Sequence, residues 1–465
     1  MKFRSSAYKI LFLAVVFLQA CDKNDPAPAA SPNEHVNSWI YDNMKAWYYW
    51  TTDIPADPDK SVEPEPFFES LLSDEDRFSW IQEDFTELLN SLRGVSKEAG
   101  FEFALYRESG DNNNVIAQVL YVKNASPASS AGLKRGDIIS QINGTQITID
   151  NYTSLLGKLS GNHSLTFKPL DYEARTLGAT QTVNIAPVEY AEDPNYFNKV
   201  FTYNDRKIGY YVYNLFSEGP ESGDKTYTNE MNNIFGSFKS QGITDLVIDL
   251  RFNSGGAETA AQNLASLIVK GASSTTVFAR HEYNEQITAE IKSNPDLGEG
   301  FLNVPFLSKT ENVGAMLRDS RVYILTGSRT ASASELIING LKPFMDIYLI
   351  GNTTVGKNVG SISLYDEEDP ENTWGIQPIV TKMFNSQNQS DYTNGFSPQT
   401  LDVDNGLYLY PLGDPRENLL NKALMRITGL GSISRPAETQ KAGELLFHSL
   451  DMKRRSGVLT VDRPF

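Results

Sequence analysis

The stretch DLVIDLRFNSGG, residues 245–256, decides the fold class of this chain. Its apolar first half predicts a buried strand, and an apolar pattern of helical length follows at residues 257–269. Between them, Gly255 and Gly256 let the backbone turn freely and present N–H groups at close range. The same alternation of strands and helices continues through residues 322–350. The pattern predicts an α/β core.

Two further segments of this core carry groups suited to chemistry. In TGSRTASASE, residues 326–335, Ser332 and Glu335 have the spacing of a capping box, which predicts a helix N-terminus. Backbone N–H groups at such an end would also stabilise an oxyanion. In GNTTVGKNVG, residues 351–360, Lys357 lies between glycines. A loop lysine is usually solvated, but one that returned beside the serine would be neutral and able to take its proton.

Upstream of the core, residues 85–188 change to short strands and turns. The strand 115–122 precedes SPASSAGLKRGDIISQING, residues 126–144, which ends in an Asn-Gly turn. This order resembles a PDZ domain. The resemblance implies that a peptide carboxylate meets the backbone N–H groups of a loop, and that the peptide adds a strand to the adjoining sheet edge. The residues that fall at this loop are Gly100, Phe101, Glu102 and Phe103. The alternative is a PDZ fold that only packs against its neighbour.

Together these motifs resemble the C-terminal-processing, or tail-specific, serine peptidases. The resemblance implies a core of the ClpP/crotonase type at residues 189–465, with the PDZ domain, a β-sandwich, inserted in it or preceding it. It also implies that Ser332 is the nucleophile, that Lys357 is the base, and that no metal or cofactor is needed. The implied oxyanion donors are the N–H of Ala333 and one from Gly255 or Gly256.

The third catalytic group is open, because this chain departs from the family. Many members carry glutamine four residues after the lysine, whereas this chain has Ser361. The candidates are Ser361, Glu335 and Asn358.

The N-terminal part of the chain predicts a small domain and an export signal. Residues 36–84 form an aromatic pattern with helical spacing, which predicts a small helical domain. Residues 1–20 have a basic start and a short apolar run, and with Cys21 they resemble the signal peptide of bacterial lipoproteins. The polar, proline-rich residues 21–35 predict a tether. An ordinary secretory signal with an incidental cysteine is the alternative.

Composition excludes several classes of function. The net charge of −17 disfavours nucleic acid as a partner. A single cysteine excludes disulfides within the chain and thiolate zinc sites, and the four histidines lack metal-ligand spacing. The glycine pair of the core also lacks the spacing of a phosphate loop.

The sequence therefore predicts a serine endopeptidase that cleaves proteins near C-terminal or unstructured tails. Its partners would be a polypeptide with a free C-terminus and a lipid bilayer, at a face of the cell envelope that the sequence leaves open. The alternative is a catalytically silent, lipid-anchored PDZ protein that binds peptides. A Ser-His-Asp hydrolase is disfavoured because no nucleophile-elbow motif occurs. The short S-x-x-K match at residues 222–225 lacks its partner motifs.

The lipoprotein interpretation makes a direct prediction about Cys21. Replacing Cys21 with Ser removes the thiol that would carry lipid, so the protein should move from the membrane fraction to the soluble fraction. Fractionation after a high-salt wash measures this, and a Cys21→Ser protein that stays with membranes contradicts the interpretation.

Overall fold

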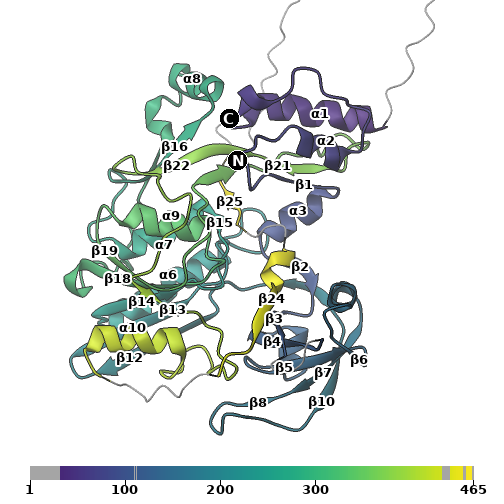
Figure 1. Ribbon diagram of the computed structural model, residues 1–465. Helices are drawn as coiled ribbons and strands as arrows, with labels where there is room; N and C mark the ends of the chain where they lie inside the picture. Colours follow the sequence, from purple (N-terminus) through teal and green to yellow (C-terminus); the bar gives the residue numbers. More distant parts are fainter. Residues whose placement is uncertain (1–31, 109, 111–112, 432–439, 454–456, 463–465) are drawn as a thin grey trace, which may run out of the picture.

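The computed structural model describes residues 32–108, 110, 113–431, 440–453 and 457–462, which form three packed parts (Figure 1). The predicted signal peptide, Cys21 and the tether up to residue 31 lie outside these residues, and the last four residues of the predicted tether begin the first helix. In the described ranges, no helix is long and apolar enough to span a membrane.

The central sheet of the core is largely parallel and is built around residues 245–256. That stretch forms a fully buried strand, then the glycine turn, then a helix, as predicted. The strands lie in the order β12 (Phe197–Tyr203), β13 (Arg206–Val212), β14 (Asp245–Asp249), β18 (Arg321–Thr326), β19 (Asp346–Gly351) and β23 (Thr400–Leu401). Strand β12 is antiparallel to β13, and the remaining pairs are parallel.

Both faces of this sheet are buried, which explains the nearly continuous apolar runs of its strands. Leu246 and Ile248 of β14 join one hydrophobic core and Val247 joins the other. The first core holds the helices α6 (Thr226–Gln241), α7 (Glu258–Ile268) and α9 (Ala333–Leu341), and the second holds α10 (Asn418–Thr428).

A second sheet covers the helix that follows Ser332. Its strands lie in the order β15 (Gly256–Ala257), β25 (Leu459–Thr460), β20 (Val359–Ser361), β22 (Ile379–Asn385), β16 (Val277–Tyr283) and β17 (Asn303–Pro305). Helix α9 packs against β19 of the first sheet and against β16 and β22 of the second. Every residue of α9 is therefore buried.

The PDZ domain has its own hydrophobic core and a sheet that receives one strand from far along the chain. The order is β10 (Gln181–Ile185), β7 (His163–Lys168), β5 (Ile138–Ile142), β4 (Val115–Val122), β3 (Phe101–Arg107) and β24 (Glu444–His448), with β6 (Thr145–Gln146) beside β5. Figure 1 shows β24, in yellow, against the blue PDZ strands. Strand β24 satisfies the otherwise open edge of β3 although it comes from the part of the chain assigned to the core.

The N-terminal part begins with an aromatic helix whose buried residues join the first hydrophobic core of the peptidase part. Its elements are α1 (Pro32–Trp47), α2 (Pro64–Ser70), β1 (Trp80–Gln82) and α3 (Phe85–Leu92). One face of α1 is fully buried together with the residue directly after the helix, as the helical spacing at residues 36–84 predicts. The buried residues are Ile40, Met44 and Tyr48. Strand β1 pairs with β21 (Gly375–Gln377), and this pairing holds the segment that precedes it beside the lysine loop.

The remaining elements are short or peripheral. Strand β2 (Val95–Glu98) pairs with β11 (Val188–Ala191). The others are the strands β8 (Leu170–Asp171) and β9 (Thr176–Leu177), the helices α4 (Pro127–Ser130), α5 (Tyr152–Leu156) and α8 (Glu285–Ser293), and the 3-10 turns η1 (Thr51–Asp53), η2 (Gly157–Ser160), η3 (Glu299–Leu302), η4 (Arg318–Ser320) and η5 (Ser449–Met452).

Candidate active site

Ser332 lies directly before α9 in a backbone conformation that few non-glycine residues adopt. Its φ of 62° and ψ of −115° are unfavourable for a residue with a Cβ, and such strain is typical of functional sites. The serine is fully buried, and its Oγ has no hydrogen-bond partner among the described residues. Only half of the predicted capping box is therefore formed: Glu335 accepts the N–H of Ser332, whereas the serine hydroxyl is not used as a cap.

The Glu335 carboxylate joins the serine loop to the lysine loop. It accepts hydrogen bonds from the N–H of Ser332 (2.9 Å), the N–H of Lys357 (2.8 Å), the N–H of Gly356 (2.7 Å) and the hydroxyl of Thr354 (2.6 Å). Burial raises the pKa of Glu335, and these four donors oppose that effect. One buried carboxylate thus determines where both candidate catalytic residues lie.

Lys357 is buried beside this carboxylate with a free amine. Its side chain is 1% exposed, and Nζ has no hydrogen-bond partner in the described part of the chain. Burial lowers the pKa of Lys357 to about 7, because the ammonium loses its hydration, and the charges of Asp76 and Glu335 only partly oppose this. Near neutral pH, a substantial fraction of Lys357 is therefore an uncharged base.

The N-terminal part of the chain supplies the wall around Lys357. Lys357 Nζ lies 4.8 Å from the ring centroid of Phe78, and Arg77 donates to the carbonyl of Gly356 (2.8 Å). The sequence analysis included Arg77 and Phe78 only in the predicted helical domain of residues 36–84 and missed this role. No spacing rule connects them to a lysine loop almost 280 residues further along the chain.

The glycine turn lies against the serine, but its N–H groups are already engaged. A Cβ added to Gly255 would come within 2.7 Å of Ser332 Cβ, so only glycine allows this approach. Gly255 donates to Asn253 Oδ1 (2.9 Å), and Gly256 donates to the carbonyl of Val458 (2.7 Å). The prediction of an open oxyanion donor at Gly255 or Gly256 is therefore wrong for this conformation.

Asn253 supports the glycine turn, and the N–H of Ala333 remains the other predicted oxyanion donor. Asn253 also donates to the carbonyl of Tyr213 (2.9 Å), which holds the turn against the sheet. Ala333 is the first residue of α9, where an N–H group has no acceptor within the helix.

The three candidates for a third group differ in what they contact. Ser361 Oγ donates to the carbonyl of Leu459 (3.1 Å) and accepts from Gln377 (3.0 Å). The Asn358 amide donates to the carbonyl and the hydroxyl of Ser390. Only Glu335 hydrogen-bonds to the residues of the candidate pair, through their backbone.

The predicted peptide-binding loop of the PDZ domain is occupied by the chain itself. The N–H of Phe103 donates to the Ser449 hydroxyl (2.9 Å). The buried Glu102 carboxylate accepts from the same hydroxyl (2.5 Å) and pairs with Lys453. Gly100 and Phe101 precede the occupied edge of β3. In this conformation the loop is not open to a peptide carboxylate, which corrects the expectation of a free site.

The fold agrees with the comparisons with known proteins. A model of peptidase family S41 matches residues 207–400, a model of the peptidase S41 N-terminal domain matches residues 35–80, and a PDZ-domain model matches residues 118–168. The chain belongs to peptidase family S41. The predicted family and the predicted combination of a peptidase core with a PDZ domain are confirmed.

Individual proteins are similar to this chain in structure or in sequence. A putative S41 protease from Bacteroides fragilis has a similar structure, with a TM-score of 0.69 and 26% identity over 88% of this chain and 99% of the other. A carboxyl-terminal-processing protease of Picosynechococcus is 26% identical over 52% of this chain, and the carboxy-terminal processing protease CtpA of Bacillus subtilis is 23% identical over 59%. These two alignments span only 51% and 50% of the relatives' lengths.

The burial of Lys357 makes a prediction about stability. The lysine is neutral in the folded protein and charged in the unfolded chain between pH 7 and its usual pKa of 10.5, so stability falls as the pH falls through this window. Below about pH 7 the full penalty applies. Lys357→Met fills the same space without a charge and should raise the free energy of unfolding at pH 7 by a few kcal/mol. Denaturant titration measures this.

The exposed Lys225 provides the control for this measurement. Lys225→Met should change the free energy of unfolding by less than about 1 kcal/mol. If Lys357→Met is instead less stable than the wild type, the burial of Lys357 does not cost the protein stability, which contradicts the prediction.

Proposed function

We propose that this protein is a serine endopeptidase that cleaves proteins near C-terminal or unstructured tails with a Ser332–Lys357 dyad and without a metal or organic cofactor. One observation carries the proposal. A buried serine hydroxyl and a buried lysine amine, both without hydrogen-bond partners among the described residues, lie on loops that a single carboxylate joins. Burying such groups unpaired is costly for a fold, which supports a catalytic role.

The proposed reaction begins with a proton transfer. The neutral Lys357 amine takes the proton of Ser332 Oγ while this oxygen attacks the carbonyl carbon of the scissile peptide bond. The oxyanion that forms is stabilised by the N–H of Ala333 and the N-terminus of α9. The Lys357 ammonium then gives its proton to the leaving amine, and an acyl-enzyme on Ser332 remains. Water hydrolyses this ester, with Lys357 again as the base.

The PDZ domain and the names of the relatives support a polypeptide tail as the substrate. PDZ domains take an extended peptide on a sheet edge, and β3 is the edge that would do so here. Two relatives are named as carboxyl-terminal-processing proteases. We also propose that the enzyme works at the cell envelope, attached to a bilayer through an acylated Cys21.

The alternative is a catalytically silent PDZ protein that is lipid-anchored and binds peptides. The burial of Ser332 and the engaged N–H groups of the glycine turn favour it. A serine-reactive phosphonate separates the two functions, because it labels an activated Ser332 and leaves a silent protein unlabelled.

The proposed dyad makes a prediction about activity and its pH dependence. Ser332→Ala and Lys357→Arg should each reduce cleavage of an unstructured protein at least about 10³-fold, because one lacks the nucleophile and the other stays protonated. In the wild type, kcat/KM should rise with pH up to about 7, where Lys357 loses its proton, and then level off. A Ser332→Ala protein with wild-type cleavage would exclude the proposal.

A second prediction identifies the third group. Glu335→Gln places an amide NH2 among four donors, so kcat should fall about 10²-fold. Because the Glu335 charge raises the pKa of Lys357, its loss should also move the acid limb of the pH profile to lower pH. Ser361→Ala should cost less than Glu335→Gln. The opposite order, with an unshifted pH profile for Glu335→Gln, would assign the role to Ser361.

A further inference from the structure

One segment of the chain occupies both places where a substrate of the proposed protease would lie. It comprises residues 444–453 and 457–462, and we call it the return segment, because it returns from the core to the PDZ domain and then back to the serine. It holds β24, η5 and β25.

The first part of the return segment lies on the PDZ domain as a ligand would. Strand β24 is antiparallel to β3, with Glu444 opposite Arg107 and His448 opposite Ala104. Leu446 and Phe447 pack against the hydrophobic core of the PDZ domain. An added antiparallel strand with side chains in apolar pockets is the mode by which PDZ domains bind peptides.

The Ser449 hydroxyl takes the place expected for the ligand's terminal carboxylate. It accepts the Phe103 N–H at the start of β3 and donates to the buried Glu102 carboxylate. Lys453 pairs with the same carboxylate. Glu102 keeps Lys123 as a second cationic neighbour at 3.6 Å, so loss of Lys453 would not leave this carboxylate unpaired.

The middle of the return segment is clamped to the loop that carries the serine. Asp451 forms a two-pronged ion pair with Arg329, with distances of 2.7 and 2.6 Å. Arg329 is three residues before Ser332. The return segment therefore contacts both the PDZ groove and the loop that carries Ser332.

The last part of the return segment lies beside Ser332. Strand β25 is parallel to both β15 and β20, and the carbonyl of Val458 accepts the N–H of Gly256. The same carbonyl and Ser332 Cβ flank Gly255: a Cβ on Gly255 would lie 2.6 Å from one and 2.7 Å from the other. The Val458 carbonyl thus takes up the N–H of Gly256, one of the groups that the family resemblance assigns to the oxyanion of a substrate.

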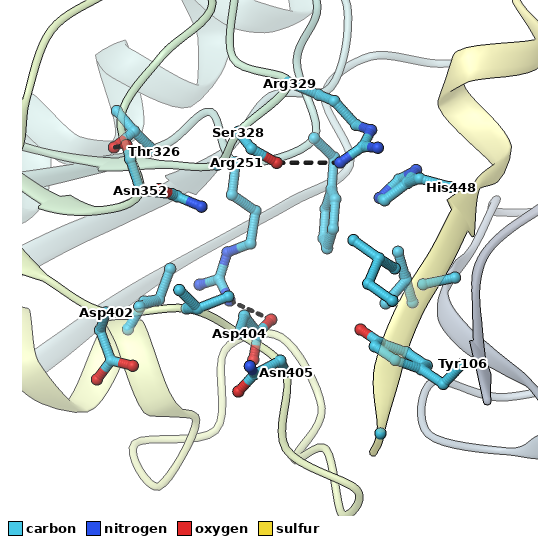
Figure 2. A pocket seen from close by; sticks show the side chains of 18 residues that line it. Tyr106, Arg251, Thr326, Ser328, Arg329, Asn352, Asp402, Asp404, Asn405 and His448 are labelled. Carbon is cyan, nitrogen blue, oxygen red and sulfur yellow. Dashed lines mark hydrogen bonds and ion pairs between the residues drawn. The ribbon is translucent and has the colours of Figure 1, made fainter. Parts of the chain in front are cut away.

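Some contacts of the return segment are exposed enough to be exchanged, whereas its Leu450 and Leu459 belong to hydrophobic cores. A cavity of about 200 Å³ lies between β24 and the core, where Tyr106 and His448 face Arg329, Asp404 and Asn405 (Figure 2). Leu445 and Met452 are about half exposed. The ion pair of Asp451 is partly exposed, and such pairs contribute little to stability individually.

From these contacts we propose that the return segment is an internal competitor of the substrate. Given the peptidase function proposed above, it closes the protease until an extended polypeptide replaces it on β3 and beside Gly256. The partner that fits is a polypeptide tail with apolar side chains where Leu446 and Phe447 lie and an oxygen acceptor where Ser449 lies. The apparent affinity for substrate is then reduced by the small fraction of molecules in which the segment is released.

A reversible staple tests this proposal. Ala104 and His448 are directly opposite each other on β3 and β24, at a separation that a disulfide can bridge. In the full-length A104C/H448C protein, oxidation should reduce cleavage of an unstructured protein at least about tenfold, and reductant should restore it. The single variants A104C and H448C, which retain the natural Cys21, are the controls. Equal cleavage by the oxidised and reduced double variant would overturn the proposal.

Weakening the contacts of the return segment should have the opposite effect. The D451N/K453M double variant should cleave the same protein about three- to tenfold faster at low substrate concentration. Asp205, in an exposed ion pair with Arg318 on the core, provides the matched control: Asp205→Asn should leave the rate unchanged. An unchanged rate in D451N/K453M, with phosphonate labelling of Ser332 intact, excludes the internal competitor but leaves the peptidase proposal standing.

A binding measurement covers the outcome in which neither the wild type nor any variant cleaves the unstructured protein or is labelled by the phosphonate. That result would exclude the peptidase function. A fluorescent peptide of residues 440–453 should still bind D451N/K453M at least about threefold more tightly than the wild type, because the wild-type groove is already occupied. Equal binding would exclude the internal competitor as well.

Discussion

The carboxylate of Glu335 is the constraint on which the arrangement of this site depends. It receives the N–H groups of Ser332 and Lys357 at once, so two loops that come from different strands keep a common position. Its burial is tolerable because four donors compensate for the water it loses. The sheets on either side of α9 exclude solvent from the carboxylate and so make each of these hydrogen bonds stronger.

Around this carboxylate, the fold retains several features that oppose its own stability. Ser332 has a positive φ, and Lys357 is buried without a hydrogen-bond partner among the described residues. The rest of the structure compensates: Arg251 pairs with Asp249 and Glu417 beneath the glycine turn, and Arg77 holds the lysine loop from the N-terminal part. Strain that is concentrated at one site and supported elsewhere is typical of functional centres.

The return segment gives the PDZ domain a physical connection to the serine. Its strand on β3, its ion pair with Arg329 and its carbonyl at Gly256 follow one another along the same stretch of chain. Under the proposal, replacing the first contact weakens the next, because the released chain no longer holds the others in place. On the same proposal, binding at the PDZ edge and access to Ser332 are two ends of one equilibrium, which includes a shift of β25 away from β15 in the second core sheet.

The sequence by itself determined the α/β core, the PDZ domain and the glycine turn, because each rests on local patterns: apolar runs, glycines and short motifs with set spacing. It predicted the pair Ser332 and Lys357 only through the family resemblance that these motifs carry. Only the tertiary structure decided what surrounds them. Phe78 over Lys357, Glu335 as the link between loops, and Ser449 in the PDZ loop are contacts between segments distant in sequence. The engaged N–H of Gly256 depends likewise on Val458, some 200 residues further along. Hydrogen bonds and burial between such distant segments are set by packing, which no local spacing encodes.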